Sequence, residues 1–395
     1  MLIIYSLVLS LLICESHSLS FGNAGIGSKL HRDQQEAKTR RALVEERLLK
    51  KPGIELAEHV HKPKAGVGSG FGSNGLSDLK FSVAQEQAAT LRKDGVIRID
   101  NAVRRESALA LGAQVLSDLK VAQGMIEAGE IDARHVLGME PERKCRTELL
   151  LSFTMLADKT DGNKIVTDIL QELIGEYGSV RQLYEQMVSE KGTLYDFAAL
   201  VTEPGSDRQQ LHSDMPFHTK PALYSIFVAL QDVSMAMGPT VFLPGSITAD
   251  IQSEFSFLGS RDDFCASQQP YFALLKAGDL VMYDPRVLHC GSANLIAGGS
   301  TRMMFNLGFR NPEFVGDMGY EGSIRPDYSG RISLGDITAR LQASAGTGTG
   351  GQAKYGAYKR KKKTKKGKAA GAQGEAVGEE ALVHLQNQDR ACAVL

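Results

Sequence analysis

The sequence predicts a mainly β domain, a barrel or sandwich with flanking helices. Its centre carries short apolar runs separated by turn-forming residues, as an all-β fold requires. In the segment before them, apolar residues recur at helical spacing instead. The strand-like runs cover residues 197–201, 222–230, 240–243, 271–275, 280–283 and 303–307.

The overall composition is that of an ordinary globular protein. The chain has 395 residues and a net charge of −1, so no overall field attracts nucleic acid. Its five cysteines include no CxxC pair, which argues against a Cys-rich zinc site. One β domain with helical additions can account for most of this length.

The composition divides the chain into four parts. Residues 1–20 resemble a signal peptide, because their uncharged apolar run is too short to cross a bilayer comfortably; an uncleaved anchor is the alternative. Residues 21–75 are basic and end in a Gly-rich linker, and residues 76–345 form the folded domain. Residues 346–395 are a disordered, Lys-rich tail that is suited to an anionic partner. We expect entry into the secretory pathway or, through a two-part presequence, into a plastid.

Helical signals surround the strand-like runs. Ser82-Val83-Ala84-Gln85 is a capping-box pattern, so we expect a helix from Ser82 that ends at Gly95, followed by a strand over 96–99. A charged helix is expected over 31–51 and a short helix over 249–257. Helical spacing predicts two amphipathic helices, one through Ala108, Leu111, Val115 and Leu119, the other through Ile165, Ile169 and Leu173.

Two separate pieces of sequence together predict a metal site. His212 and Asp214 are two residues apart, so on an extended chain their side chains point to the same side. His289, from a distant strand, would complete a 2-His-1-carboxylate facial triad, which is diagnostic of non-haem Fe(II) oxygenases. His218 lies nearby as a decoy ligand. The alternative is two ordinary loop histidines and a turn aspartate.

Several motifs resemble the phytanoyl-CoA dioxygenase-like branch of the Fe(II)/2-oxoglutarate oxygenases. The resemblance spans about residues 77–311 and implies a double-stranded β-helix core, which is jelly-roll or cupin-like. It also implies Fe(II), O2 and 2-oxoglutarate as cosubstrate, with ascorbate as an accessory reductant. The matching motifs are Leu91–Asp100, Pro204-Gly205, Gln209-Gln210-Leu211-His212-Ser213-Asp214, Gly238-Pro239-Thr240-Val241-Phe242-Leu243-Pro244-Gly245-Ser246, Gly278-Asp279-Leu280-Val281-Met282-Tyr283, His289 and Arg302.

The resemblance also assigns roles around the metal. Arg302, thirteen residues after His289, fits the distal carboxylate of 2-oxoglutarate, because a guanidinium binds carboxylates through two parallel hydrogen bonds. Gln210 and Thr202 are expected near the cosubstrate, and no catalytic residue is expected beyond the metal ligands. The chain departs from the family at Ile247, where many members have His, and at Met304, where a hydroxyl residue is common.

These residues predict a dioxygenase that hydroxylates a small or lipid-like organic substrate and releases succinate and CO2. Because Asp214 is retained, hydroxylation, or a related oxidation such as desaturation, is favoured over halogenation, which in iron halogenases of this broad group goes with a small residue there. Three alternatives remain open: a catalytically silent β-barrel binding protein, a cupin-type metalloenzyme that does not use 2-oxoglutarate, and a nucleic-acid-binding protein suggested only by the tail. The sequence predicts neither the substrate's identity nor the oligomeric state.

Overall fold

The computed structural model describes residues 26–53, 73–138, 144–152, 161–257 and 261–346. The chain divides into two compact units, residues 1–47 and 48–395. Helix α2 (Ile26–Leu49) provides the described residues of the first unit, 26–47, and matches the charged helix expected over 31–51. The signal-like segment and the Lys-rich tail beyond Gly346 lie outside the described residues.

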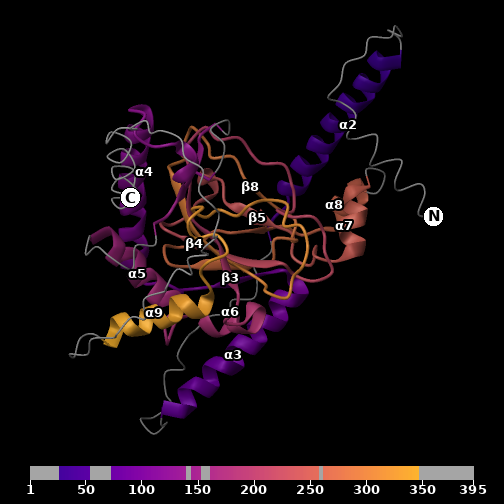
Figure 1. Cartoon of the computed structure of the whole chain (residues 1–395). Helices are drawn as coiled ribbons and strands as arrows, with labels where there is room; N and C mark the ends of the chain where they lie inside the picture. Colours follow the sequence, from indigo (N-terminus) through magenta and orange to yellow (C-terminus); the bar gives the residue numbers. More distant parts are fainter. Residues whose placement is uncertain (1–25, 54–72, 139–143, 153–160, 258–260, 347–395) are drawn as a thin grey trace, which may run out of the picture. The chain divides into compact units, whose positions relative to one another are not determined.

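Two antiparallel sheets form the core of the second unit (Figure 1). The major sheet has the strand order β1-β7-β4-β9-β3-β2, and the minor sheet has the order β6-β5-β8. This arrangement confirms the predicted fold class, a double-stranded β-helix with flanking helices. The strands are β1 (Val96–Ile99), β2 (Arg146–Leu150), β3 (Thr193–Thr202), β4 (Leu223–Ala229), β5 (Thr240–Phe242), β6 (Tyr271–Phe272), β7 (Leu280–Tyr283), β8 (His289–Gly291) and β9 (Arg302–Arg310).

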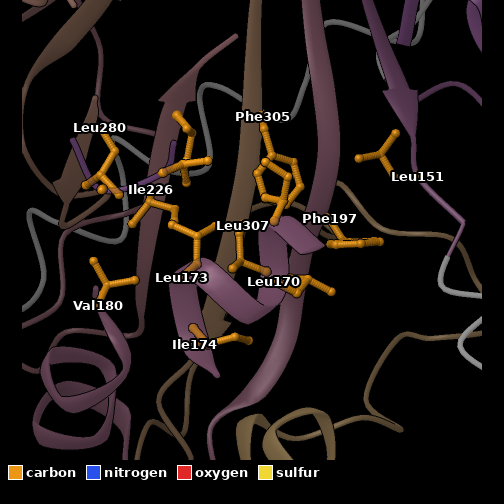
Figure 2. Packing of buried hydrophobic residues seen from close by; sticks show 14 of the residues in the cluster. Leu151, Leu170, Leu173, Ile174, Val180, Phe197, Ile226, Leu280, Phe305 and Leu307 are labelled. Atoms are coloured by element: carbon orange, nitrogen blue, oxygen red, sulfur yellow. The ribbon is translucent and has the colours of Figure 1, made fainter. Parts of the chain in front are cut away.

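Helices cover the outer face of the major sheet. Figure 2 shows Leu170 and Leu173 of α5 packed near Phe197, Phe305 and Leu307 of the sheet, all within one buried cluster. Full burial of one such side chain contributes roughly 1.5–3 kcal/mol. The helices are α3 (Ser73–Asp94), α4 (Arg105–Glu127), α5 (Asp161–Ile174), α6 (Arg181–Val188), α7 (Ala249–Ser256), α8 (Arg261–Ser267) and α9 (Leu334–Gly346), with 3-10 turns at Ala133–His135 and Met235–Met237.

The alternation of side chains along the strands places the functional residues. On β9, Phe305 and Leu307 face the helices, so Met304 and Asn306 face the opposite way, toward the interior between the sheets. The inner face of the major sheet is therefore available to line a cavity.

Most predicted elements are present, with three corrections. Helix α4 contains its four expected apolar residues, all buried, and the strands match the expected runs closely, although β6 ends at Phe272. Helix α3 begins at Ser73, so the capping pattern at Ser82 starts no helix. Extending a helix costs less than nucleating a new one, which explains why a local pattern misplaced its start. Strand β2 was not expected.

Helix α3 does end where the sequence predicted. Gly95 adopts φ +75°, and its amide donates to the carbonyl of Leu91, which is the usual way for glycine to close a helix. Within the described residues, no helix combines the length and apolar character needed to cross a membrane.

Candidate metal centre

The His-x-Asp segment lies in the connection between β3 and β4, not on a regular strand. It is held in place by pairing with the segment that leads into β8. The amide of His212 donates to the carbonyl of His289 at 3.0 Å, and the reverse bond is 2.8 Å. The amide of Asp214 donates to the carbonyl of Pro285 at 3.0 Å. This pairing supplies the extended geometry that was expected from a strand, and it brings the distant histidine alongside.

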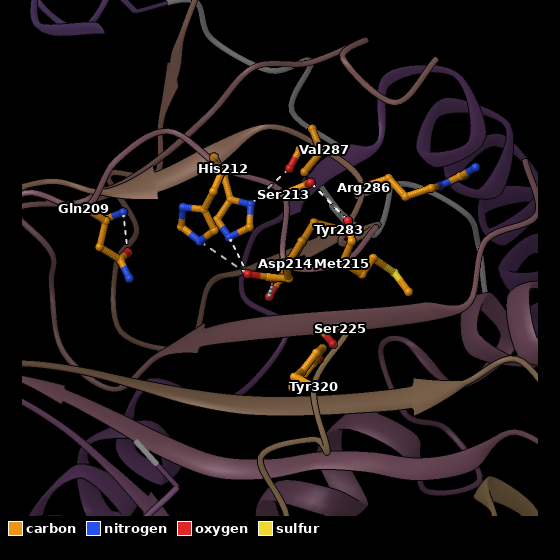
Figure 3. Close-up of polar contacts among 12 residues, drawn as sticks. Gln209, His212, Ser213, Asp214, Met215, Ser225, Tyr283, Arg286, Val287 and Tyr320 are labelled. Carbon is orange, nitrogen blue, oxygen red and sulfur yellow. Dashed lines mark hydrogen bonds and ion pairs between the residues drawn. The ribbon is translucent and has the colours of Figure 1, made fainter. Parts of the chain in front are cut away.

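The structure brings the three predicted ligands together (Figure 3). Nε2 of His212 lies 3.4 Å from Oδ1 of Asp214, and Nε2 of His289 lies 3.3 Å from the same oxygen. One potential ligand atom from each residue lies within 4.8 Å of the others. In the described part of the chain, no other group of three His, Cys, Asp or Glu residues meets this condition.

The main chain sets the tautomer of both imidazoles. Nδ1 of His212 is 2.7 Å from the carbonyl oxygen of Gln210, and Nδ1 of His289 is 3.0 Å from that of Val287. A carbonyl can only accept, so each Nδ1 carries a proton, and Nε2, which faces Asp214, is the nitrogen left to bind a metal. This outer hydrogen bond is typical of metal-bound histidine. Two imidazole nitrogens and one carboxylate oxygen are the donor set of a non-haem Fe(II) site.

The surroundings keep Asp214 ionised. Burial opposes its charge, but the positive charge of His289 and hydrogen bonds from both histidines outweigh burial and hold its pKa below the usual range. The hydroxyl of Tyr283 donates to Oδ2 at 3.4 Å. The ring of Phe242 stacks on His289 with centroids 5.6 Å apart, which fixes the plane of that imidazole. An ionised carboxylate beside two imidazole Nε2 atoms suits a divalent cation, which would take the place of the protons on this side.

Arg302 is a buried cation that faces the same cavity. It begins β9, is 5% exposed, and its Nε and Nη1 have no hydrogen-bond partner among the described residues. Nη2 donates to Oγ1 of Thr202, its register partner on β3, at 3.4 Å. Burial and the neighbouring charge of Arg146 lower the pKa of Arg302 to about 10. A buried guanidinium with unused donors fits an anionic ligand such as a carboxylate.

One cavity of about 1550 Å³ contains both features. Its lining includes the three cluster residues, Arg302 and Thr202. The volume exceeds what 2-oxoglutarate alone would need, because typical ligand pockets span roughly 300–1,000 Å³. The cavity therefore has room for a second organic molecule beside the cosubstrate.

Other predicted residues lie elsewhere. Gln210 is exposed and does not line the cavity; Gln209 lines it instead, and its Oε1 accepts the amide of Gly291 at 2.8 Å. Strict alternation from His212 would place Gln210 inward, but this connection is irregular, so the rule fails there. Nε2 of His218 contacts the carbonyl of Asp317 at 2.9 Å, away from the cluster. The nearby Arg286, which was not among the predicted site residues, forms an ion pair with Asp284 at 2.6 Å.

The structure also places the two departures from the family pattern and the neighbouring cavity residue Tyr195. Ile247 is buried next to Gly95, and Met304 lines the cavity on β9. Tyr195 lines the cavity from β3, and its hydroxyl donates to the carbonyl of Tyr320. None of the three belongs to the cluster of ligands.

Sequence reasoning missed four polar residues that line the cavity: Arg146, Glu148, Asp196 and Asn306. The first two alternate with Leu150 on the inner face of β2, a period-2 signal in a strand that was not expected. Asp196 accepts from Ser225 Oγ at 2.6 Å, and burial raises its pKa despite that bond. A lone Asp or Asn within an apolar run gave no signal of its own.

Comparison with known proteins identifies the family. Residues 91–304, more than half of the chain, match the family model "Phytanoyl-CoA dioxygenase (PhyH)". No curated protein matches the chain.

Solved structures show weaker similarity. The α-ketoglutarate-dependent epimerase SnoN of nogalamycin biosynthesis is 18% identical, with a TM-score of 0.38, covering 62% of this chain and 95% of its own. The carbocyclase SnoK of the same pathway is 16% identical, with a TM-score of 0.40, covering 64% and 92%. AviO1 from Streptomyces viridochromogenes Tue57 is 15% identical, with a TM-score of 0.40, covering 59% and 97%.

The family match covers both halves of the ligand cluster, from helix α3 through the start of β9. Iron and 2-oxoglutarate, the cofactor and cosubstrate expected from the sequence, agree with this family and with the His-Asp-His cluster. The chain belongs to the phytanoyl-CoA dioxygenase family, and it is a 2-oxoglutarate oxygenase.

Proposed function

We propose that the protein hydroxylates a small or lipid-like organic substrate with Fe(II), O2 and 2-oxoglutarate. The observation that carries the proposal is that one cavity contains both the His212–Asp214–His289 cluster and the buried, incompletely satisfied Arg302. A cation of this kind, 95% buried and without a counter-charge among the described residues, is costly unless a ligand completes it.

Each residue has a separate task. His212, Asp214 and His289 would hold iron, and Arg302 with Thr202 would hold the distal carboxylate of 2-oxoglutarate. When bound, iron and 2-oxoglutarate would supply an oxidation by O2. One oxygen atom of O2 would enter the substrate as a hydroxyl and the other would enter succinate, with loss of CO2. The rings of Phe242 and Tyr283 both pack against His289 and keep that imidazole oriented.

The retained carboxylate supports oxygen insertion over halogenation. Asp214 is engaged by both histidines and by Tyr283, so that ligand position is already taken by the protein. Arg302 distinguishes the proposal from a cupin that does not use 2-oxoglutarate, because such chemistry requires no buried cation at this place. A silent binding protein would have no need to hold the tautomer of both imidazoles.

The test combines metal binding with succinate release. His212→Ala, Asp214→Ala or His289→Ala should each abolish 2-oxoglutarate turnover and weaken Fe(II) binding, because two protein ligands hold iron poorly. His218→Ala is the matched control, since that imidazole lies outside the cluster, and it should keep both properties. Loss of iron in His218→Ala together with retention in His289→Ala would refute the assignment.

A further inference from the structure

The cavity is acidic beyond the metal ligands. Among the described residues, four Asp or Glu besides Asp214 line it, together with three Arg. Arg302 is assigned to 2-oxoglutarate, and Arg134 forms an exposed ion pair with Asp132. Bound Fe(II) and the 2-oxoglutarate dianion cancel each other's charge, so the substrate meets an excess of carboxylates. A coenzyme A thioester, which carries several phosphate charges, is a poor match for such a lining.

Asp196 is a buried carboxylate on β3 that lines the cavity from the inner face of the major sheet. It is 2% exposed and, among the described residues, forms no ion pair with a cation. It accepts from Ser225 Oγ at 2.6 Å, from the amide of Ser323 at 3.0 Å and from Tyr320 Oη at 3.3 Å. These bonds fix its direction but bring no positive charge.

The sheet leaves room for this carboxylate. A Cβ at Gly308, the register partner of Asp196 on β9, would lie 2.4 Å from Oδ2 of Asp196. The contact is too close for any residue with a side chain unless the carboxylate moves. The glycine therefore lets the Asp196 carboxylate lie over β9 in the row that also contains Ser225 and Tyr283.

A second, independent feature points to a ligand in the same region. Asn306 lies on β9 two residues before Gly308, is 6% exposed and lines the cavity. Its Oδ1 has no hydrogen-bond partner among the described residues. Two residues along a strand span roughly 7 Å. The unpaired Oδ1 of Asn306 and the Asp196 carboxylate therefore lie at neighbouring positions on the inner face of the major sheet. An unsatisfied buried acceptor calls for a donor.

The Asp196 carboxylate lies close enough to Asp214 for their charges to interact, and Asn306 lines the same cavity. The charge of Asp214 acts on both Asp196 and Tyr320. Figure 3 shows Ser225 of β4 and Tyr320 of the segment after β9, two of the groups that hold Asp196, across from Asp214 and the histidines. A group anchored there would present a neighbouring carbon to the metal site.

We propose that Asp196 and Asn306 form a substrate subsite for a protonated amine, and that the substrate is a small amine or amino acid and not an acyl-coenzyme A. The amine donates one N–H to the Asp196 carboxylate and another to Oδ1 of Asn306. The proposal rests on the proposed function for its role in catalysis, although binding of the amine by itself requires neither iron nor turnover.

Calorimetry on the full-length, metal-free protein tests the subsite directly. The probes are L-amino acids and primary amines, their N-acetyl counterparts, and acyl-coenzyme A thioesters. At least one amine should bind, and its N-acetyl counterpart should bind at least about 10-fold more weakly, because acetylation removes the charge. Succinate release with Fe(II) should then rank the probes in the same order. Preference for an acyl-coenzyme A or an N-acetyl compound, or no binding by any amine, would overturn the proposal.

Variants locate the binding to these residues. Asp196→Asn keeps the shape and most hydrogen bonds but removes the charge, so amine affinity should fall roughly 10- to 100-fold while N-acetyl affinity stays unchanged. Asn306→Leu removes the unpaired acceptor Oδ1 and should weaken amine binding roughly 2- to 10-fold. If Asp196→Asn does not fold, this variant tests the subsite in its place. Glu321→Gln removes an equal charge from an exposed residue at the cavity rim, where solvent screens it, and should change affinity less than about 2-fold. Equal effects of Asp196→Asn and Glu321→Gln would refute the subsite.

The two proposals fail in different ways. If the amine binds the metal-free protein but no succinate forms with Fe(II) and 2-oxoglutarate, the proposed oxygenase reaction is wrong and the subsite stands. If succinate forms only with an acyl-coenzyme A, the reaction stands and the amine subsite is wrong.

Discussion

At the scale of single residues, Arg302 has opposite effects on stability and on function. Its buried guanidinium has two unsatisfied nitrogens, and Arg146 adds a like charge nearby. Without a bound anion, this arrangement destabilises the folded state, because a desolvated charge lacks compensation. With the distal carboxylate of 2-oxoglutarate bound there, as we propose, the same donors would be satisfied.

Arg302→Leu should therefore stabilise the ligand-free protein while it impairs catalysis. We expect the free energy of unfolding, measured by urea denaturation without 2-oxoglutarate, to rise by about 1–3 kcal/mol. The 2-oxoglutarate KM should rise roughly 10- to 150-fold, with iron still bound. Arg310→Leu, at the other end of β9, is the control and should change neither quantity appreciably. A less stable Arg302→Leu protein would show that the guanidinium is already compensated.

The cluster of candidate metal ligands could be predicted from sequence because two side chains that bind one metal must point to the same side of the chain, as residues two apart on an extended segment do. His212, Asp214 and His289 were identified without knowledge of the pairing that brings them together. Gln210 was expected near the cosubstrate, but Gln209 occupies that side, since alternation holds only on regular strands. Asp196 and Asn306 could not be found, because a single polar residue in an apolar strand has no periodic signature.

At the scale of elements, close contacts made by glycine decide where strands begin. Gly278 precedes β7 with φ +93°, and its main chain bonds both to Ala229 and to Val103. A Cβ there would lie 2.1 Å from the carbonyl oxygen of Val103. This turn therefore sets the start of the strand that carries Tyr283 to the metal centre.

Gly278→Ala should cost far more than a comparable change without this contact. Strain from the positive φ and the backbone clash together should lower the free energy of unfolding by about 3 kcal/mol or more. Gly330 also has a positive φ, +67°, but open space surrounds its Cβ position, so Gly330→Ala should cost only about 1 kcal/mol. Chemical denaturation of both variants measures the difference. Equal losses would mean that the contact with Val103 relaxes without cost.

Elements whose apolar residues recur at a regular spacing were predicted well, and elements without such a pattern were not. The four apolar residues of α4 are all buried, as their spacing required. Strand β2 has two charged residues facing the cavity, so its composition resembles a surface loop until the cavity is known. The start of α3 depended on cooperative extension of the helix, which a four-residue pattern cannot reveal.

At the scale of the whole molecule, the metal should act as a cross-link. Asp214 and His212 belong to the connection that leaves the major sheet, while His289 belongs to the minor sheet. An ion that binds all three joins parts of the chain that are distant in sequence. Because binding selects the folded state, metal adds to the stability of the whole domain.

Thermal unfolding with and without metal measures this contribution. Mn(II), an oxygen-stable substitute for Fe(II), at about 100 times its Kd should add about 2.7 kcal/mol and raise Tm by roughly 5–10 °C. EDTA should reverse the shift, His289→Ala should abolish it, and His218→Ala should retain it. A shift that survives in His289→Ala would indicate that the ion binds elsewhere.

The hydrogen bonds from the two imidazoles to main-chain carbonyls have a consequence for engineering. Gln210 and Val287 each provide a peptide oxygen to the histidine two positions later, so the chemistry of their own side chains does not enter. The orientation of the nitrogen donors is thus encoded in the path of two short peptides and in their mutual pairing. Grafting the site into another β scaffold would require transplanting those two segments as one unit, whereas copying three side chains onto a foreign backbone would leave the imidazoles free to turn.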